Sequence, residues 1–186
     1  MALVRKAKSE GIPVTAEVTP HHFTLTDEAV ARFGTNAKMN PPLRSGKDLE
    51  AVLAAIADGT IDAIASDHAP HSIQTKSVEF HEAAFGIIGL ETSVSLGLDR
   101  LLHTNTVGLN RLIELYSLNP ARILGVSRGI QVGADADLTL IDPGKQVRVD
   151  ASKFLSKSRN TPFDGWSLRG APAATIVQGS IASRSL

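Results

Sequence analysis

Cysteine is absent from the 186 residues of this sequence. Its absence excludes a disulfide framework and every metal site that depends on thiolate ligands. It also fits a protein of a reducing compartment, so we expect a cytoplasmic location. Any metal ion that this chain binds must therefore be held by histidine, aspartate or glutamate side chains.

The sequence also lacks long apolar runs and an excess of either charge. No apolar run reaches the ~18 residues of a membrane-spanning helix, so we predict no membrane span. The 19 basic and 19 acidic residues cancel, which leaves no electrostatic reason to bind nucleic acid or an anionic membrane surface. Residues 1–12 are rich in lysine and arginine but lack the apolar segment of a signal peptide. The composition, 42% hydrophobic and 20% charged, is that of a soluble globular protein with a core.

Helix and strand signals alternate in the first third of the chain. Residues 14–19 and 61–66 are candidate strands, because each is a short run rich in β-branched or apolar residues. Between them, Ser45 can cap a helix and Gly59 can end it. Its apolar residues recur at the spacing of one helix face: Leu49, Val52, Leu53 and Ile56. This alternation is typical of a parallel sheet with crossover helices, so we predict an α/β fold.

Two further features bear on how the chain is organised. A helix is predicted for residues 2–10, but no residue before it can cap it, so we expect a further segment upstream. After about residue 126, glycines and short β-branched runs replace the helical periodicity, which predicts a small antiparallel β unit. We therefore expect two parts, residues 1–125 and residues 126–186.

Asp67 is the strongest candidate for chemistry. It follows directly on the second candidate strand, and alternate strand residues share a face, so it lies on the side of the small residues Ala63 and Ala65. His68 and His71 come directly afterwards. A carboxylate at a strand end with imidazoles just beyond it is how an α/β barrel presents chemical groups. The alternative is that Asp67 only caps the loop by accepting hydrogen bonds from backbone N–H groups.

Three other positions allow both a functional and a structural interpretation. His21 and His22 follow the first candidate strand, and they could bind or orient a metal or be hydrogen-bonded loop residues. Asn40 precedes two prolines, so it could offer a fixed donor and acceptor or simply form a turn. The segment Phe85-Gly86 could bring backbone close to a ligand, because glycine has no side chain, or could be an ordinary loop.

Four segments of the chain resemble bacterial class I dihydroorotases of the amidohydrolase superfamily, in the same order and at the same spacings. They are residues 14–22 (VTAEVTPHH), 38–44 (KMNPPLR), 65–71 (ASDHAPH) and 85–92 (FGIIGLET). Residues 136–142 and 160–163 also resemble that family. The resemblance covers nearly the whole chain but only the C-terminal part of a family member.

The resemblance implies a fold and an activity. The fold would be the C-terminal portion of a TIM-like (β/α)8 metal-dependent hydrolase barrel, residues 1–125, followed by part of a small β-sandwich domain, residues 126–186. The activity would be that of dihydroorotase, the reversible cyclisation of N-carbamoyl-L-aspartate to dihydroorotate in de novo pyrimidine biosynthesis. A zinc ion would activate water for attack on the ring amide carbonyl.

The resemblance also implies roles for single residues. Asp67 would be a metal ligand at the end of the eighth barrel strand and would also be the catalytic base. Asn40, His71 and the backbone of Phe85 and Gly86 would contact the substrate. The residues expected to perform the chemistry would therefore lie on three successive loops.

The metal site implied by the resemblance is incomplete in this chain. Family members supply a His-x-His pair, an aspartate or modified lysine, and two more histidines from the region before the one matched. The Pro-His-His segment is not among the family's metal ligands, so we favour hydrogen-bonded loop residues for His21 and His22. Asp67 alone cannot hold zinc, since catalytic zinc sites use about three protein ligands. We therefore expect this chain to be inactive by itself.

We expect macromolecular partners, and two other functions stay open. Open strand edges and bare helix faces favour a homo-oligomer or a complex with a complementing N-terminal chain. Besides the small-molecule substrate, no nucleic acid or membrane partner is expected. The first alternative is a non-catalytic relative that serves as a scaffold for a partner such as aspartate transcarbamoylase. The second is another cyclic amidohydrolase, such as a hydantoinase or an allantoinase.

Overall fold

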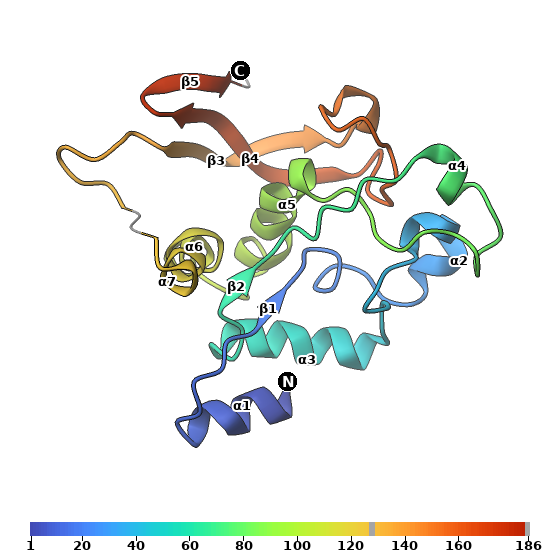
Figure 1. Ribbon diagram of the computed structural model, residues 1–186, viewed down its shortest axis with the longest axis horizontal. Coiled ribbons are helices and arrows are strands. Elements are labelled where there is room, and N and C mark those ends of the chain that lie inside the picture. The colour runs from blue at the N-terminus through green and yellow to red at the C-terminus, as the bar shows by residue number, and fades with distance from the viewer. Residues whose placement is uncertain (127–128, 185–186) are drawn as a thin grey trace.

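The structure is a computed structural model that describes residues 1–126 and 129–184. It contains a short parallel strand pair and a larger antiparallel sheet formed by the C-terminal part of the chain (Figure 1). Helical segments of residues 90–124 lie between the two. Helices α1 (Ala2–Ser9) and α3 (Gly46–Ala57) lie on the other side of the parallel pair.

The parallel pair consists of β1 (Glu17–Val18) and β2 (Ala63–Ile64), with Val18 opposite Ile64. One further backbone hydrogen bond on each side continues the ladder, at N···O distances of 2.8 and 3.0 Å. Among the described residues, each strand has a single neighbour. Both strands are shorter than the predicted runs, because the ladder ends where the two strands diverge. The parallel pairing with helices in the crossover confirms the predicted α/β alternation.

The crossover from β1 to β2 carries α2 (Ala29–Phe33), the 3₁₀ turn η1 (Gly34–Ala37) and α3. Helix α3 begins at the predicted cap, where the backbone N–H and the hydroxyl of Ser45 donate to the Asp48 carboxylate at 3.2 and 2.7 Å. The Ser45 hydroxyl is the main reason why the pKa of Asp48 lies below its usual value. This capping box confirms the predicted start of the helix.

Between β2 and β3, the described residues form six helical segments. The last two α-helices are continuous, because a π-type turn leads directly from one to the next. Pro120 lies directly after this π-type turn, at the start of the second helix, and Gly125 ends that helix with a φ of 67°. The segments are α4 (Ile73–Lys76), α5 (Leu90–Gly97), η2 (Leu98–Leu102), α6 (Leu109–Ile113), η3 (Glu114–Leu118) and α7 (Asn119–Leu124).

The antiparallel sheet has the strand order β3 (Leu138–Arg148), β4 (Ser167–Val177) and β5 (Ser180–Arg184). A short 3₁₀ helix, η4 (Ala151–Lys153), follows β3. A tight turn through Gly179, which has a φ of 77°, joins β4 to β5. These strands confirm the small antiparallel β unit predicted from the sequence.

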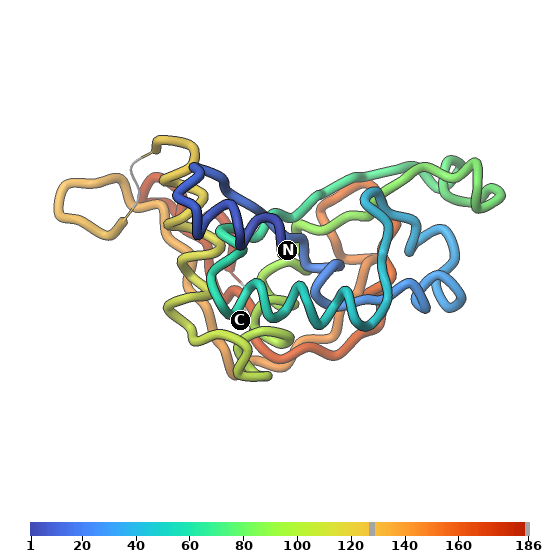
Figure 2. The backbone as a smooth tube through the Cα atoms, turned by 90° about the horizontal axis from the view of Figure 1, so that it is seen from below, coloured from blue at the N-terminus to red at the C-terminus, as the bar shows by residue number. Residues whose placement is uncertain are grey.

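One hydrophobic core joins the two parts of the chain. Its buried side chains include Ile56, Ile61 and Leu96 from the N-terminal part, and Phe163 and Leu168 from the C-terminal part. Viewed from below, the segment around α4 and the segment before β3 project from opposite ends of this body (Figure 2). The boundary at residue 125 stays a prediction. In the part of the chain that the structure describes, no helix is both long and apolar enough to cross a membrane.

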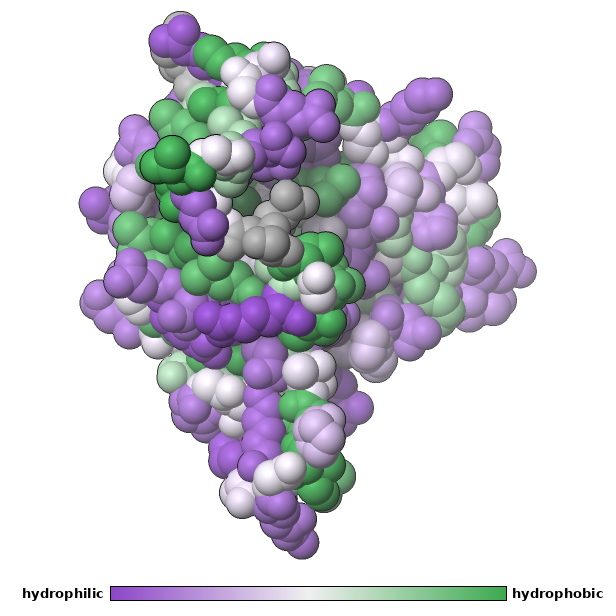
Figure 3. Space-filling model, turned by 60° about the vertical axis from the view of Figure 1, so that its left-hand side comes forward, coloured by the Kyte–Doolittle hydropathy of each residue, from purple (hydrophilic) through white to green (hydrophobic). Residues whose placement is uncertain are grey.

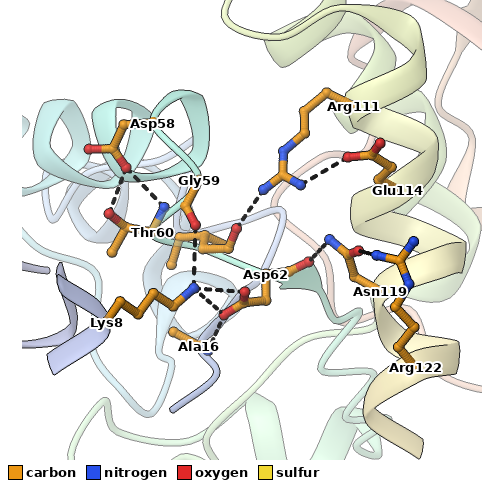
Figure 4. Close-up of polar contacts among 11 residues, drawn as sticks. Lys8, Ala16, Asp58, Gly59, Thr60, Asp62, Arg111, Glu114, Asn119 and Arg122 are labelled. Atoms are coloured by element: carbon orange, nitrogen blue, oxygen red, sulfur yellow. Dashed lines mark hydrogen bonds and ion pairs between the residues drawn. The ribbon is translucent and has the colours of Figure 1, made fainter. Parts of the chain in front are cut away.

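Polar contacts tie the N-terminal end of β2 to helices on both sides (Figure 4). The Asp62 carboxylate accepts hydrogen bonds from the Lys8 ammonium at 2.7 Å and from the Ala16 N–H at 2.8 Å. The Asp62 carbonyl accepts one from the Asn119 side-chain amide at 2.9 Å, and Arg111 donates to the preceding carbonyl at 2.9 Å. These contacts link α1, β1, β2 and the α6–α7 helix, so they stabilise the parallel pair.

Asp62→Ala is expected to lower the free energy of unfolding by about 1–3 kcal/mol, because it leaves the half-buried Lys8 ammonium and the Ala16 N–H without their acceptor. Glu10→Ala is the matched control, since Glu10 pairs with Lys6 at 3.7 Å on the surface and should cost less than about 1 kcal/mol. Urea denaturation monitored by circular dichroism would measure both. Equal losses for the two variants would contradict the role given to Asp62.

Candidate functional site

Asp67 lies just beyond the C-terminal end of β2, as predicted. Its backbone is left-handed, with a φ of 46°, a conformation that is uncommon outside glycine and often marks a functional position. The side chain is 45% exposed. Among the described residues, no backbone N–H donates to its carboxylate, so the loop-capping interpretation has no hydrogen bond to support it.

His21 lies beside Asp67, although the sequence pattern did not link them. Its Nε2 is 3.8 Å from Oδ2 of Asp67, which is beyond hydrogen-bonding distance. Burial, with a smaller contribution from His22, lowers the pKa of His21 to about 3, so the ring is uncharged at neutral pH. Within the described part of the chain, Nε2 is buried without a hydrogen-bond partner. The prediction of a hydrogen-bonded loop residue is therefore wrong for this nitrogen.

His22 fits the hydrogen-bonded loop interpretation. Its Nδ1 pairs with the Thr19 hydroxyl at 2.7 Å, and its Nε2 pairs with the Pro41 carbonyl at 3.0 Å. Since a carbonyl oxygen can only accept, Nε2 is the donor in the contact with Pro41. His22 thus fastens the turn after β1 to the loop that carries Asn40.

His68 caps a helix instead of facing a ligand. Its Nδ1 accepts hydrogen bonds from the backbone N–H groups of Gly89 and Leu90, at 3.1 and 3.3 Å. These groups begin α5 and have no acceptor within the helix. One of the two imidazoles that follow Asp67 therefore serves the fold.

His71, Phe85 and Gly86 are brought together by the structure. Nε2 of His71 donates to the Phe85 carbonyl at 2.7 Å, which leaves Nδ1 as the free nitrogen of that ring. Gly86 has a φ of 102°, and a Cβ there would lie 2.6 Å from the Cβ of Ala69. Only glycine allows the two loops to approach this closely.

Asn160 fixes both of these loops, although no pattern in the sequence assigned it a role. The residue is 5% exposed. Its side-chain amide donates to the carbonyls of Ala69 and Gly86 at 3.0 and 3.2 Å, and its side-chain oxygen accepts from the His71 N–H at 3.2 Å. Its place in residues 160–163, a segment that resembles the family, was the one signal that could have found it.

Two buried lysines hold the backbone carbonyls of the loop that carries Phe85. Lys76 donates to the carbonyls of Ala84 and Gly86 at 2.9 and 3.0 Å. Lys38 donates to the carbonyl before Ala84 at 2.6 Å, and its Nζ lies 4.4 Å from the centre of the Phe85 ring. Burial, with a smaller contribution from Lys38, lowers the pKa of Lys76 to about 8.

Asn40 is exposed on the loop next to this cluster. A backbone hydrogen bond of 2.9 Å from the Gly86 N–H to the Lys38 carbonyl joins the two loops. Among the described residues, the side chain of Asn40 makes no hydrogen bond with Asp67 or His71. The structure therefore brings the loop of Asn40, but not its side chain, into contact with the other predicted site residues.

The described residues contain no group of three or more His, Cys, Asp or Glu side chains that could hold a metal ion. Asp67 could serve as one ligand of a metal ion, because its carboxylate is exposed and, among the described residues, its oxygens accept no hydrogen bond from the backbone. The other ligands of a catalytic metal would have to come from outside the described part of the chain.

Comparison with known proteins identifies similar chains. A model of the amidohydrolase family matches residues 2–182. The dihydroorotase of Geobacter sp. (strain M21) is 55% identical over 180 residues, and that of Caldanaerobacter subterraneus subsp. tengcongensis is 51% identical over 179 residues. Each alignment covers 96% of this chain but 42% of the relative, so the chain spans less than half the length of the curated relatives it matches.

Solved structures of similar fold include an L-hydantoinase (dihydropyrimidinase) from Arthrobacter aurescens. It has a TM-score of 0.93 and 33% identity, over 98% of this chain and 42% of that protein. A dihydropyrimidinase from Brevibacillus agri has a TM-score of 0.90 at 21% identity, over 97% of this chain and 41% of that protein, and this likeness shows the fold alone. Together they confirm the predicted fold class, the C-terminal portion of a TIM-like barrel followed by a small β unit.

Asn160→Ala is expected to lower the free energy of unfolding by about 2–4 kcal/mol, because it leaves buried polar groups on two loops without partners. Hydrogen exchange should also become faster at the amides of Ala69, His71 and Gly86. Ser158→Ala is the control, since within residues 1–126 and 129–184 its hydroxyl makes no hydrogen bond to these loops. Unchanged exchange in Asn160→Ala would contradict the role of Asn160.

Stability is expected to rise with pH between about 8 and 9.5 because of Lys76. The unfolded chain keeps this lysine protonated up to its usual pKa of 10.5, whereas the folded chain loses the proton near 8. Unfolding therefore takes up a proton in this window, which raises the free energy of unfolding by at most about 1.4 kcal/mol per pH unit. Urea titrations at several pH values would measure the slope. Lys76→Met should lose it, whereas the surface variant Lys47→Met should keep it.

Proposed function

This chain belongs to the amidohydrolase family, and we propose that it is the C-terminal part of a dihydroorotase. The reaction would be the reversible cyclisation of N-carbamoyl-L-aspartate to dihydroorotate. The observation that carries the proposal is the 55% identity to a dihydroorotase along 180 residues, a stretch that includes all the candidate site residues. The contacts among His71, Phe85 and Gly86 beside the strand that leads to Asp67 support it further.

Asp67 would move the proton in this reaction. In the hydrolytic direction, water adds to the ring amide carbonyl and the C–N bond of the ring breaks. The Asp67 carboxylate takes the proton from the water and returns it to the leaving nitrogen, and ring closure runs the same steps in reverse. An exposed carboxylate with no backbone hydrogen bond among the described residues is suited to this role, because its oxygens are not taken up by the fold.

The substrate would be held by the loops around Asp67. The Phe85 carbonyl and the Gly86 carbonyl each accept a hydrogen bond within the chain, and the Gly86 N–H donates one. Among the described residues, the Phe85 N–H and Nδ1 of His71 are left without partners, so we propose these two groups as substrate contacts, with Asn40 as a third. Gly86 would contribute by the close approach that its missing side chain allows.

A metal ion would complete the site. Dihydroorotases of the amidohydrolase family are typically metal-dependent, and we propose zinc for this chain. Asp67 would be one ligand, and the others would come from the part of the relatives that this chain does not span. When bound, the metal polarises the amide carbonyl and lowers the pKa of water.

One face of the molecule would be covered in the assembled enzyme. On the side of α6, α7 and β3, apolar side chains surround a hollow of about 590 Å³ (Figure 3). Ile130, which lines the hollow, is 89% exposed, and Leu124 at the end of α7 is 74% exposed. Apolar surface gathered in this way marks an interface. We infer that this face is covered by the part of the relatives that this chain does not span. We also infer that, without that part, the chain associates with further copies of itself.

A second candidate activity is the hydrolysis of another cyclic amide, such as a hydantoin. The likeness to the L-hydantoinase supports it, at lower identity than the likeness to the dihydroorotases. Both activities would use the same aspartate, so the substrate profile of the assembled enzyme separates them. In either case the cytoplasmic location stays a prediction.

The test is to combine this chain with the segment of the Geobacter dihydroorotase that this chain does not span, in the presence of Zn²⁺. The mixture should form a complex of defined mass and hydrolyse dihydroorotate, whereas the chain alone should not. Asp67→Asn should lower kcat by about 10²–10⁴-fold, because it removes the proton acceptor. Asp27→Asn, a change at an exposed carboxylate in the crossover, should leave kcat unchanged.

Two results would contradict the proposal. One is a zinc-loaded complex of the right mass that hydrolyses hydantoin but not dihydroorotate. The other is a kcat that is the same in the Asp67→Asn complex as in the unaltered complex.

A further inference from the structure

The register of the parallel pair brings two side chains together at its C-terminal end. Val18 lies opposite Ile64, and His21 and Asp67 follow this pair by the same number of residues (18 to 21 and 64 to 67). At that point Nε2 of His21 lies 3.8 Å from Oδ2 of Asp67. A slip of one residue would turn the side chains of one strand to the other face. The register thus brings the ends of the two strands side by side, and the turn that begins at residue 20 and the left-handed backbone of Asp67 complete the approach of the two groups.

The two side chains differ in their freedom to move. His21 is 1% exposed, and its ring packs against that of His22 with 4.5 Å between the ring centres. His22 is fixed in turn, because both of its ring nitrogens are hydrogen-bonded. The side chain of Asp67 is 45% exposed and can rotate. His21 is therefore the fixed member of the pair, and Asp67 is the one that can adjust.

Nε2 of His21 is a buried polar atom without a partner among the described residues. Such atoms are rare in folded proteins, because burying an unsatisfied donor costs free energy, and they often mark a functional contact. The Asp67 carboxylate is the acceptor within reach. A rotation that brings Oδ2 closer by about 1 Å would give a hydrogen bond of ordinary length.

We propose that His21 is a positioning residue, which donates its Nε2–H to one oxygen of the Asp67 carboxylate and directs the other oxygen at the metal position and the reacting groups. This inference rests on the proposed function, in which Asp67 moves the proton. A carboxylate held at one oxygen loses rotational freedom, so its second oxygen stays aligned with the substrate. His21 acts through Asp67 and touches no substrate itself.

The first test uses the assembled enzyme described above. His21→Leu fills similar space but has no donor, so kcat should fall by about 10–100-fold, the usual effect of losing a group that orients a ligand. KM should stay nearly unchanged, because the substrate contacts lie on other loops. His21→Gln can place an amide donor near the position of Nε2, and it should recover most of the lost rate.

The control variant is Phe23→Leu, because Phe23 lies in the same turn and its buried side chain belongs to the hydrophobic core. It should lower stability and leave kcat near that of the unaltered enzyme. A kcat for His21→Leu equal to that of the unaltered enzyme would overturn the proposal. So would an equal fall of kcat in His21→Leu and His21→Gln, because the donor would then not be what matters.

The second test does not need activity. In this chain labelled with ¹⁵N-histidine, Asp67→Ala should shift the Nε2 resonance of His21 and leave the resonances of His22 in place. An unmoved His21 resonance would overturn the proposal. If the assembled enzyme fails to hydrolyse dihydroorotate, the proposed function is wrong, and the resonance still decides whether His21 and Asp67 are in contact.

Discussion

The pairing of β1 with β2 is the constraint on which the rest of the structure depends. The register of Val18 with Ile64 fixes which residues meet at each end of the pair. At the C-terminal end it brings His21 to Asp67, and at the N-terminal end it brings Ala16 to the carboxylate of Asp62. A few backbone hydrogen bonds thus set the candidate site and the contacts that hold the surrounding helices.

The two ends of the pair differ in how their carboxylates are satisfied. The oxygens of Asp62 accept hydrogen bonds from an ammonium and a backbone N–H, so that group is fully committed to the fold. Asp67 has no such bonds among the described residues and keeps an exposed side chain in a left-handed backbone. Polar groups that are left unsatisfied at the C-terminal end of parallel strands are available to a ligand, whereas satisfied ones contribute stability.

The C-terminal β unit also belongs to the candidate site, because the segment before β4 carries Asn160. This one side chain joins the loop after β2 to the loop of Phe85-Gly86, and two buried lysines hold the latter from the other side. The loops are therefore ordered by contacts within this chain. The metal ligands are different, since all but one would come from the part of the relatives that lies outside it.

The sequence by itself determined the local features and the family. The Ser45 cap and the alternation of helices and strands depend on residues a few positions apart, so they could be predicted. The motif around Asp67 placed the candidate base in the same way. Only the tertiary structure decided that His21 faces Asp67 and that Asn160 joins two distant loops. These contacts depend on strand register and on the packing of the C-terminal sheet, which no local spacing encodes.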